Sequence, residues 1–225
     1  MGFTRARERF FTSNAAKSLV QAKSWILDFL LFLRLIILTN MIIIQKMELR
    51  DIMDYDYVKK ALAFGFDHSA ALDPATLIAL PEVRDMCAAD KCRSYGKRWT
   101  CPPACGSVEE NQRKINSYNS GLLVQTTGAL IDEFDYEEMT LTGERHKDRF
   151  NAFRNTLGRD SLALGAGACT LCETCSYPTP CRYPDQAVSS MEAYGLLVNR
   201  VCEANGLEYY YGNRTITYTG CYLFL

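Results

Sequence analysis

Histidine is almost absent from this sequence, which contains only His68 and His146 among its 225 residues. A metal site built from three histidines is therefore excluded, and no H-E-x-x-H motif occurs. A G-x-G-x-x-G turn after a strand, a P-loop and a G-x-S-x-G motif are missing as well. The sequence thus gives no support for nucleotide-binding or serine-hydrolase chemistry.

Net charge is also low, at −1, but the charges are distributed unevenly. Residues 1–46 contain seven Lys and Arg against two Asp and Glu, whereas residues 47–225 contain eighteen against twenty-four. The larger part is therefore mildly acidic and lacks the basic surface that nucleic-acid binding requires. We expect no nucleic-acid partner. The apolar fraction of 48% is sufficient for a globular core.

The first 46 residues differ from the rest and form an N-terminal extension. Within it, residues 25–44 include sixteen apolar residues, a length that suits one bilayer crossing. Asp28 and Arg34 interrupt this segment, and each costs about 2.5–3.5 kcal/mol at a bilayer centre. We expect translation to begin at Met41 or Met47 and the protein to be cytoplasmic. The protein would contact a membrane only if residues 25–44 were a genuine anchor. A further alternative is that these residues form a helix that packs on the soluble fold.

Residues 47–225 show alternating helix and strand patterns. The spacing of apolar residues and the capping signals predict helices over 54–64, from Ser107 to about 118, through His146 to a stop at Gly158, and from Ser189 to about 205. Buried strands are expected over 121–127 and 161–167, and a C-terminal hairpin turning at Gly212-Asn213. The order predicts an α/β fold, with α+β as the alternative: a sandwich of helices on a small mixed sheet with two cysteine-rich metal loops.

Ten cysteines are unusual for this length, and none precedes position 87. The stronger cluster has the spacing C-x2-C-x2-C-x5-C, and its members are Cys169, Cys172, Cys175 and Cys181. This run is close to the bacterial ferredoxin pattern, with the last gap lengthened by two residues. It favours an iron–sulfur cluster, most simply of the [4Fe-4S] type. Zinc is the alternative cofactor, and redox-active or structural thiols are a third possibility.

The second cluster lies in a loop over residues 86–106 and has the spacing C-x4-C-x8-C-x3-C. Its members are Cys87, Cys92, Cys101 and Cys105. Nearby lysines and arginines could lower the pKa of these thiols or offset the charge of an anionic site. We predict a metal site here too. In one interpretation only Cys87, Cys92 and Cys101 are ligands, which leaves a coordination position open, and a basic surface loop with buried thiols is the alternative.

The two remaining cysteines are expected in the core. Cys202 stands among apolar residues of the last predicted helix, and Cys221 opens the apolar segment CYLFL. His146 falls on an apolar stripe with Phe150 and Phe153, so a structural role is favoured over metal ligation.

Two sequence blocks carry a resemblance to a known family. The first block runs from Cys87 to Pro103 and ends in KCRSYGKRWTCPP. The second runs from Cys169 through PCRYP to the segment SMEAYG at 190–195. The ending TYTGC fits the same resemblance. The chain resembles a family of prokaryotic predicted metal-binding proteins, catalogued as domain of unknown function 2284. The resemblance covers most of residues 47–225 and implies metal binding through these cysteines. It implies no substrate and no catalytic residue.

The leading hypothesis is a metal-binding protein that holds one [4Fe-4S]-type cluster and exchanges electrons with a redox protein partner. Two rivals stay open: a structural zinc-binding interaction protein, and a cluster-dependent redox enzyme with its substrate at the Cys87–Cys105 loop. A cluster tied by four thiolates has no open site and favours electron transfer, whereas a three-cysteine site favours catalysis. Whether the protein is an enzyme is therefore left undecided by the sequence.

Overall fold

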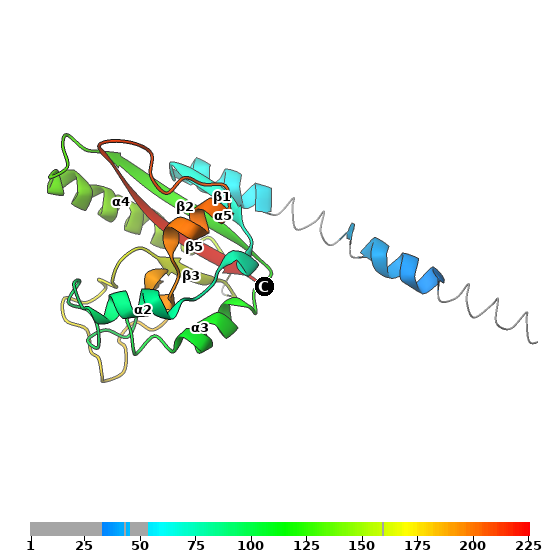
Figure 1. Ribbon diagram of the computed structural model, residues 1–225, viewed down its shortest axis with the longest axis horizontal. Helices are drawn as coiled ribbons and strands as arrows, with labels where there is room; N and C mark the ends of the chain where they lie inside the picture. The colour runs from blue at the N-terminus through cyan, green and yellow to red at the C-terminus, as the bar shows by residue number, and fades with distance from the viewer. Residues whose placement is uncertain (1–32, 43, 46–53, 159) are drawn as a thin grey trace, which may run out of the picture. The chain divides into compact units, whose positions relative to one another are not determined.

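The computed structural model describes residues 33–42, 44–45, 54–158 and 160–225. Its central feature is a five-stranded sheet in which β2 (Ser120–Ala129) and β5 (Thr215–Phe224) pair along their full length, as Figure 1 shows. The strand order is β1-β2-β5-β3-β4. The remaining strands are β1 (His68–Leu72), β3 (Leu162–Gly165) and β4 (Ser189–Ser190).

The sheet is mixed, as predicted. The pairs β1–β2, β2–β5 and β5–β3 are antiparallel, whereas the pair β3–β4 is parallel. Side chains on β2 alternate between the two faces, because successive residues of a strand point in opposite directions. Leu123 lies in one apolar cluster, while its neighbours Leu122 and Val124 lie in another. Both faces of the sheet are therefore buried.

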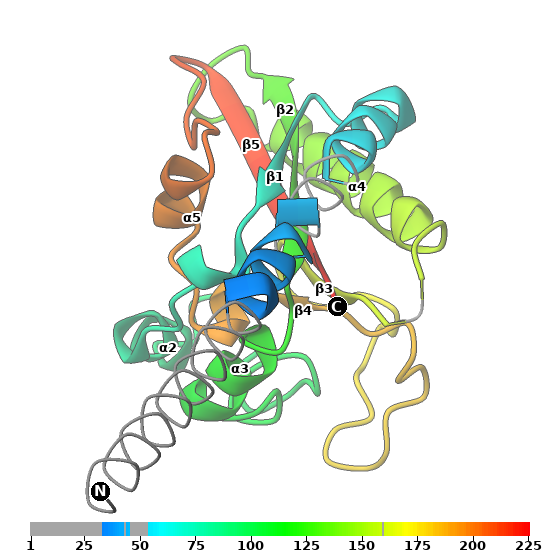
Figure 2. The same cartoon turned by 90° about the vertical axis from the view of Figure 1, so that its right-hand side faces the viewer.

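Helices cover each face. On the face of Leu123 lie α3 (Val108–Ile115) and α5 (Val198–Ala204), whose apolar side chains join the same cluster. On the face of Leu122 lie the helix over residues 54–64 and α4 (Tyr136–Arg154). Figure 2 shows α5 and α4 on opposite sides of the sheet. The α/β architecture predicted from the sequence is confirmed.

Several predicted elements are confirmed with adjusted bounds. The capping box at the start of α3 is complete, since Ser107 Oγ accepts from the Glu110 backbone N–H at 3.1 Å and Glu110 Oε2 accepts from the Ser107 N–H at 2.8 Å. The predicted strands over 121–127 and 161–167 correspond to β2 and β3. The helix through His146 starts at a cap on Asp135 and ends at Arg154, before Gly158.

The predicted C-terminal hairpin is wrong. Residues 208–211 form no strand, and β5 pairs instead with β2 and β3, which lie far away in the sequence. The local turn signal at Gly212-Asn213 was therefore overridden by non-local pairing.

The helix predicted from Ser189 to about 205 is also wrong. Ser189–Ser190 is the short strand β4, a 3-10 turn follows at Glu192–Tyr194, and α5 begins only at Val198. Ser189 therefore caps no helix, and it is the adjacent Ser190 whose Oγ accepts from the Ala193 backbone N–H at 3.1 Å.

Besides β4 and short 3-10 turns, two elements of the described chain were not predicted from the sequence. They are β1 and α2 (Pro81–Ala88), which begins with a proline at its first position and carries Cys87 near its end. The first cysteine loop therefore starts inside a helix.

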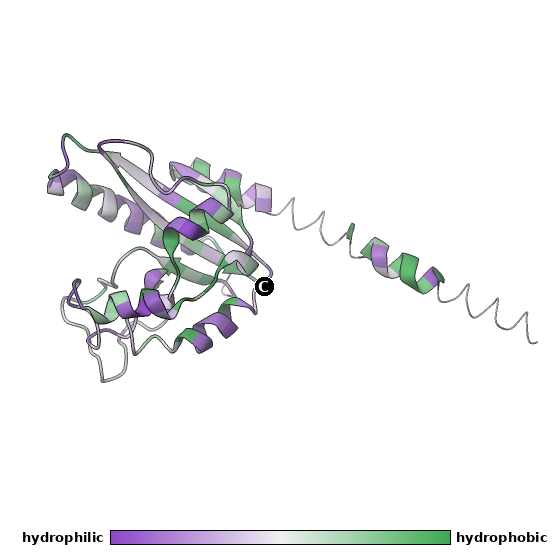
Figure 3. Cartoon of the chain, viewed as in Figure 1, coloured by the Kyte–Doolittle hydropathy of each residue, from purple (hydrophilic) through white to green (hydrophobic). Residues whose placement is uncertain are grey.

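The contacts divide the chain into two units, Met1–Asp51 and Ile52–Leu225. In the first unit residues 33–42 are helical and exposed, and Figure 3 shows that most of this helix is hydrophobic. Within the described residues, no helix combines the length and apolar character needed to cross a bilayer. Part of the predicted apolar segment 25–44 lies outside the described residues, so its role stays a prediction.

Candidate metal centre formed by two cysteine loops

The stronger cysteine cluster occupies the second cysteine loop, residues 166–187, which joins β3 to β4 without helix or strand. Four thiols of this loop line one cavity, called here the second hollow, with about 340 Å³ of empty space. They are those of Cys169, Cys172, Cys175 and Cys181, and all are free of disulfides. The loop thus brings together the four side chains that the sequence predicted as cofactor ligands.

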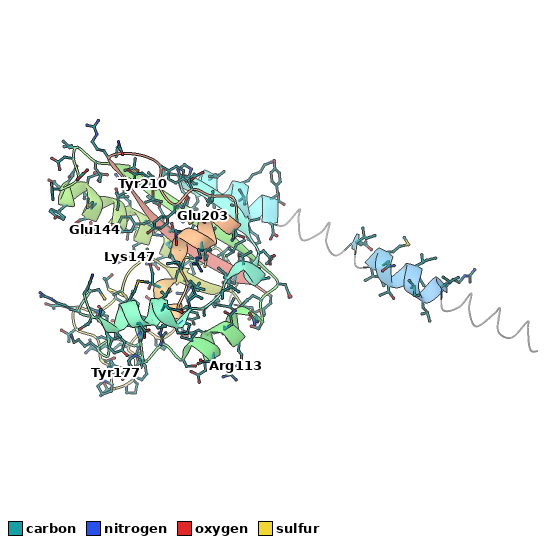
Figure 4. All side chains as sticks on the ribbon, in the orientation of Figure 1. Arg113, Glu144, Lys147, Tyr177, Glu203 and Tyr210 are labelled. Atoms are coloured by element: carbon teal, nitrogen blue, oxygen red, sulfur yellow. The ribbon has the colours of Figure 1, made fainter. Side chains whose placement is uncertain are left out.

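Residues of the first cysteine loop (86–106) form one wall of the second hollow. Arg98 Nη1 donates to the carbonyl of Cys169 at 2.8 Å, and Trp99 Nε1 donates to the carbonyl of Thr179 at 2.8 Å. The Trp99 ring also meets the Tyr177 ring edge-on, with centroids 5.1 Å apart. Figure 4 shows Tyr177 far out on the second cysteine loop. The two loops are therefore fastened to each other.

Electrostatics favour a thiolate at Cys175. Burial is the largest single influence and would raise the pKa of this thiol, whereas hydrogen bonds from the backbone N–H groups of Tyr177 and Trp99 lower it. The guanidinium groups of Arg98 and Arg182 act in the same direction, and the net result is a lowered pKa. Metal ligation requires the deprotonated form, so this position is suited to it.

The first cysteine loop forms a separate cavity, called here the first hollow, with about 590 Å³ of empty space. Three of its four cysteines line this cavity, together with Tyr95 and Glu192: they are Cys87, Cys92 and Cys101. Burial raises the pKa of Cys101 to about 11. The pKa of Cys87 is also raised, by burial and by the nearby Glu192 carboxylate. Without a bound cation, these two thiols are neutral.

Cys105 is held away from the first hollow. Its Sγ lies 3.3 Å from Arg84 Nη1 and donates to the carbonyl of Ala193 at 3.3 Å. The same guanidinium donates to the Ala193 carbonyl and to the Gly106 carbonyl, so Arg84 ties α2 to two other segments. Nothing in the sequence pattern singled out Arg84, because its partners are backbone carbonyls that only the fold brings near.

The two hollows are neighbours. Gly167 and Ala168 line the first hollow, and the next residue, Cys169, lines the second. Gly167 has φ +71°, a conformation that glycine adopts without strain. In the described parts of the chain, no three Cys, His, Asp or Glu side chains form a group that could hold a metal ion as the atoms stand. The donor atoms themselves nevertheless suit a metal, because four thiols around one cavity are the ligands that zinc and iron–sulfur clusters use.

The remaining cysteines lie in the core, as predicted. Cys202 and Cys221 are fully buried on the same face of the sheet. Burial raises the pKa of Cys202 to about 11 and that of Cys221 to about 12. Both therefore stay protonated and take no part in the two hollows.

The fold and the two loops define a cysteine-rich α/β protein whose thiols gather in adjoining cavities. This is the donor chemistry of a metal-binding protein. The chain belongs to the family described as predicted metal-binding protein, DUF2284, whose sequence model matches residues 70–224. That match includes both cysteine loops. No curated protein and no solved structure matches the chain.

Proposed function

We propose that the protein binds an iron–sulfur cluster of the [4Fe-4S] type in the second hollow and exchanges electrons with a redox protein partner. The observation that carries this proposal is that the four thiols of the second cysteine loop line one cavity. Four thiolates would bind all four irons, which leaves no iron open to substrate and favours electron transfer.

The cysteine spacing supports an iron–sulfur cluster over zinc, and the nearby cations suit either thiolate-bound group. The C-x2-C-x2-C run is typical of ferredoxin-type clusters, whereas zinc more often uses two separated C-x2-C knuckles. Arg98 and Arg182 supply positive charge close to Cys175, which offsets the negative charge of a thiolate-bound cluster. A cytoplasmic location belongs to the same proposal, because the cluster requires reduced thiols.

Metal and sulfide analysis tests the proposal. The full chain, purified without oxygen, should be brown, with a broad charge-transfer band and equal amounts of iron and acid-labile sulfide. Stoichiometric zinc with no labile sulfide would contradict the proposal. That result would favour a structural zinc protein whose surface binds a partner.

A second candidate function is a cluster-dependent redox enzyme with its substrate at the first cysteine loop. The observation that favours it is the first hollow, which three cysteine side chains line while Cys105 contacts Arg84 and Ala193 instead. Three thiolate ligands would leave one coordination position open beside Glu192, where a substrate atom could bind. This is the three-cysteine interpretation. If Cys105 were a ligand as well, as the sequence predicted, four thiolates would close the site.

Paired serine variants separate these alternatives. We expect Cys105→Ser to keep the full metal content, because Cys105 lies outside the first hollow. Cys101→Ser should lose the metal of the first loop while keeping that of the second. Iron and zinc content per chain, measured for both variants, gives the answer. Equal losses in the two variants would show that Cys105 is a ligand and that the site is closed.

A further inference from the structure

A third cavity, called here the His146 pocket, lies between α4 and the start of the second cysteine loop. Its empty space is about 450 Å³, which includes the solvent at its open mouth. Cys169 lines both this pocket and the second hollow, and Gly167 and Ala168 line both this pocket and the first hollow. The pocket is therefore next to both cysteine sites, but it contains side chains that neither of them uses.

His146 is the most buried polar side chain of the pocket, with 2% of its surface exposed. Its Nδ1 lies 3.1 Å from Thr126 Oγ1, whereas its Nε2 has no hydrogen-bond partner among the described residues. The rings of Phe66, Phe150 and Tyr218 surround the imidazole, with centroids 5.8 to 6.3 Å away. These contacts fix the ring, and Nε2 is the polar atom left for a ligand.

The imidazole is uncharged near neutral pH. Burial lowers the pKa of His146 to about 4, and the charge of Arg149 acts in the same direction. When the Thr126 hydroxyl donates to Nδ1, the proton of the neutral ring is on Nε2. In this tautomer the buried Nε2–H is a hydrogen-bond donor without a partner among the described residues, and the inference below rests on that tautomer.

The residue that follows His146 on α4 is a lysine. Lys147, which Figure 4 labels on α4, lines the pocket and donates from Nζ to Thr170 Oγ1 at 2.9 Å. No Asp or Glu is among the described residues that line the pocket. The rest of the lining is largely apolar and includes Phe150, Leu171 and Val188. The pocket thus offers a positive charge, a neutral donor and apolar walls.

We infer that the His146 pocket binds a small organic carboxylate with an apolar body. The carboxylate accepts from Lys147 Nζ and from His146 Nε2–H, and the apolar body packs against Phe150 and Val188. A ligand held there contacts the backbone that leads to Cys169, and so lies beside the second hollow. The inference concerns a site that the proposed electron-transfer function does not use, and it holds whichever metal the loops bind.

Benzoate is a suitable probe because it combines a carboxylate with an apolar ring, and benzamide is its neutral counterpart. The full chain carries only two histidines, so histidine-specific ¹⁵N labelling gives two assignable imidazole spectra. Benzoate should shift the Nε2 signal of His146 saturably and leave the signals of His68 unchanged. Benzamide should bind at least about tenfold more weakly, because it lacks the charge that Lys147 recognises.

Variants of single side chains provide the matched controls, with affinities measured by calorimetry. Lys147→Met should weaken benzoate binding about tenfold, which is the effect expected for losing a charge-assisted hydrogen bond. Lys114→Met makes the same change on α3, outside the pocket, and should leave the affinity unchanged. His146→Phe should weaken binding while filling the space of the ring.

Three results would overturn the inference: no shift of His146 at millimolar benzoate, equal affinity for benzamide, or an unchanged affinity in Lys147→Met. Any of them would mean that the pocket does not recognise a carboxylate through Lys147 and His146. Metal analysis of the same samples is independent of these measurements. Failure of the iron–sulfur proposal would therefore be recognised separately.

Discussion

Replacing Cys172 with serine should remove the metal of the second cysteine loop and destabilise the whole protein. Residues 166–187 contain no helix or strand, so under the proposed function a bound metal should supply much of the stability of this loop. A ligand present at about 1,000 times its Kd stabilises a folded protein by about 4 kcal/mol. For a chain of this size, that loss corresponds to a decrease in Tm of about 10 °C. Metal analysis and thermal unfolding of the anaerobic protein measure both effects.

Cys202→Ser is the matched control for this prediction. Cys202 is fully buried in the core, where its Sγ accepts from Gln125 Nε2 at 3.5 Å, and a serine hydroxyl can accept from the same donor. We expect its metal content to equal that of the wild type and its Tm to fall only slightly. If Cys202→Ser lost the metal as completely as Cys172→Ser, the assignment of ligands to the second loop would be refuted.

Gly220→Ala should produce the second large effect, at the contact between β5 and α4. An added Cβ at this position would lie 2.5 Å from Phe150 Cε2 and 3.1 Å from the Leu164 carbonyl oxygen. Phe150 cannot easily move aside, because its ring is buried and stacked on Tyr222 with centroids 4.4 Å apart. We expect a loss of about 2–3 kcal/mol in the free energy of unfolding, a typical cost of overpacking a core. Urea denaturation monitored by circular dichroism gives this value.

Gly158→Ala provides the comparison for Gly220→Ala. No heavy atom lies within 4 Å of the Cβ that this substitution would add. Restricting the unfolded chain should make this variant equal to the wild type or more stable by up to about 1 kcal/mol. Equal destabilisation of both variants would mean that the close packing of Phe150 on β5 is not the cause.

Elements with strong local signals could be predicted from the sequence. The capping box at Ser107 set the start of α3, the apolar run at 121–127 indicated β2, and the apolar neighbours of Cys202 indicated a core cysteine. The spacing of the second cysteine loop also singled out the four side chains that line one cavity. In each case neighbouring residues alone contain the necessary information.

The features that could not be predicted depend on distant partners. β5 pairs with β2, which lies about ninety residues earlier in the chain. The turn signal at Gly212-Asn213 therefore led to the wrong prediction of a C-terminal hairpin. The contact of Arg84 with Cys105 forms only when α2 packs beside the 3-10 turn at Glu192–Tyr194. His146 looked like an ordinary core histidine, and only the fold shows that its Nε2 lacks a partner beside a cavity.

The position of β5 has a consequence for biosynthesis. β5 lies between β2 and β3 in the sheet, yet it follows both cysteine loops in the chain. Ribosomes add about 5–20 residues per second, so several seconds separate the synthesis of Cys181 from that of Phe224. During this interval β3 lacks its antiparallel partner β5, and the sheet is not yet joined between β2 and β3. In newly made chains the eight thiols of the two loops are therefore synthesised several seconds before the strand that completes the sheet beside them.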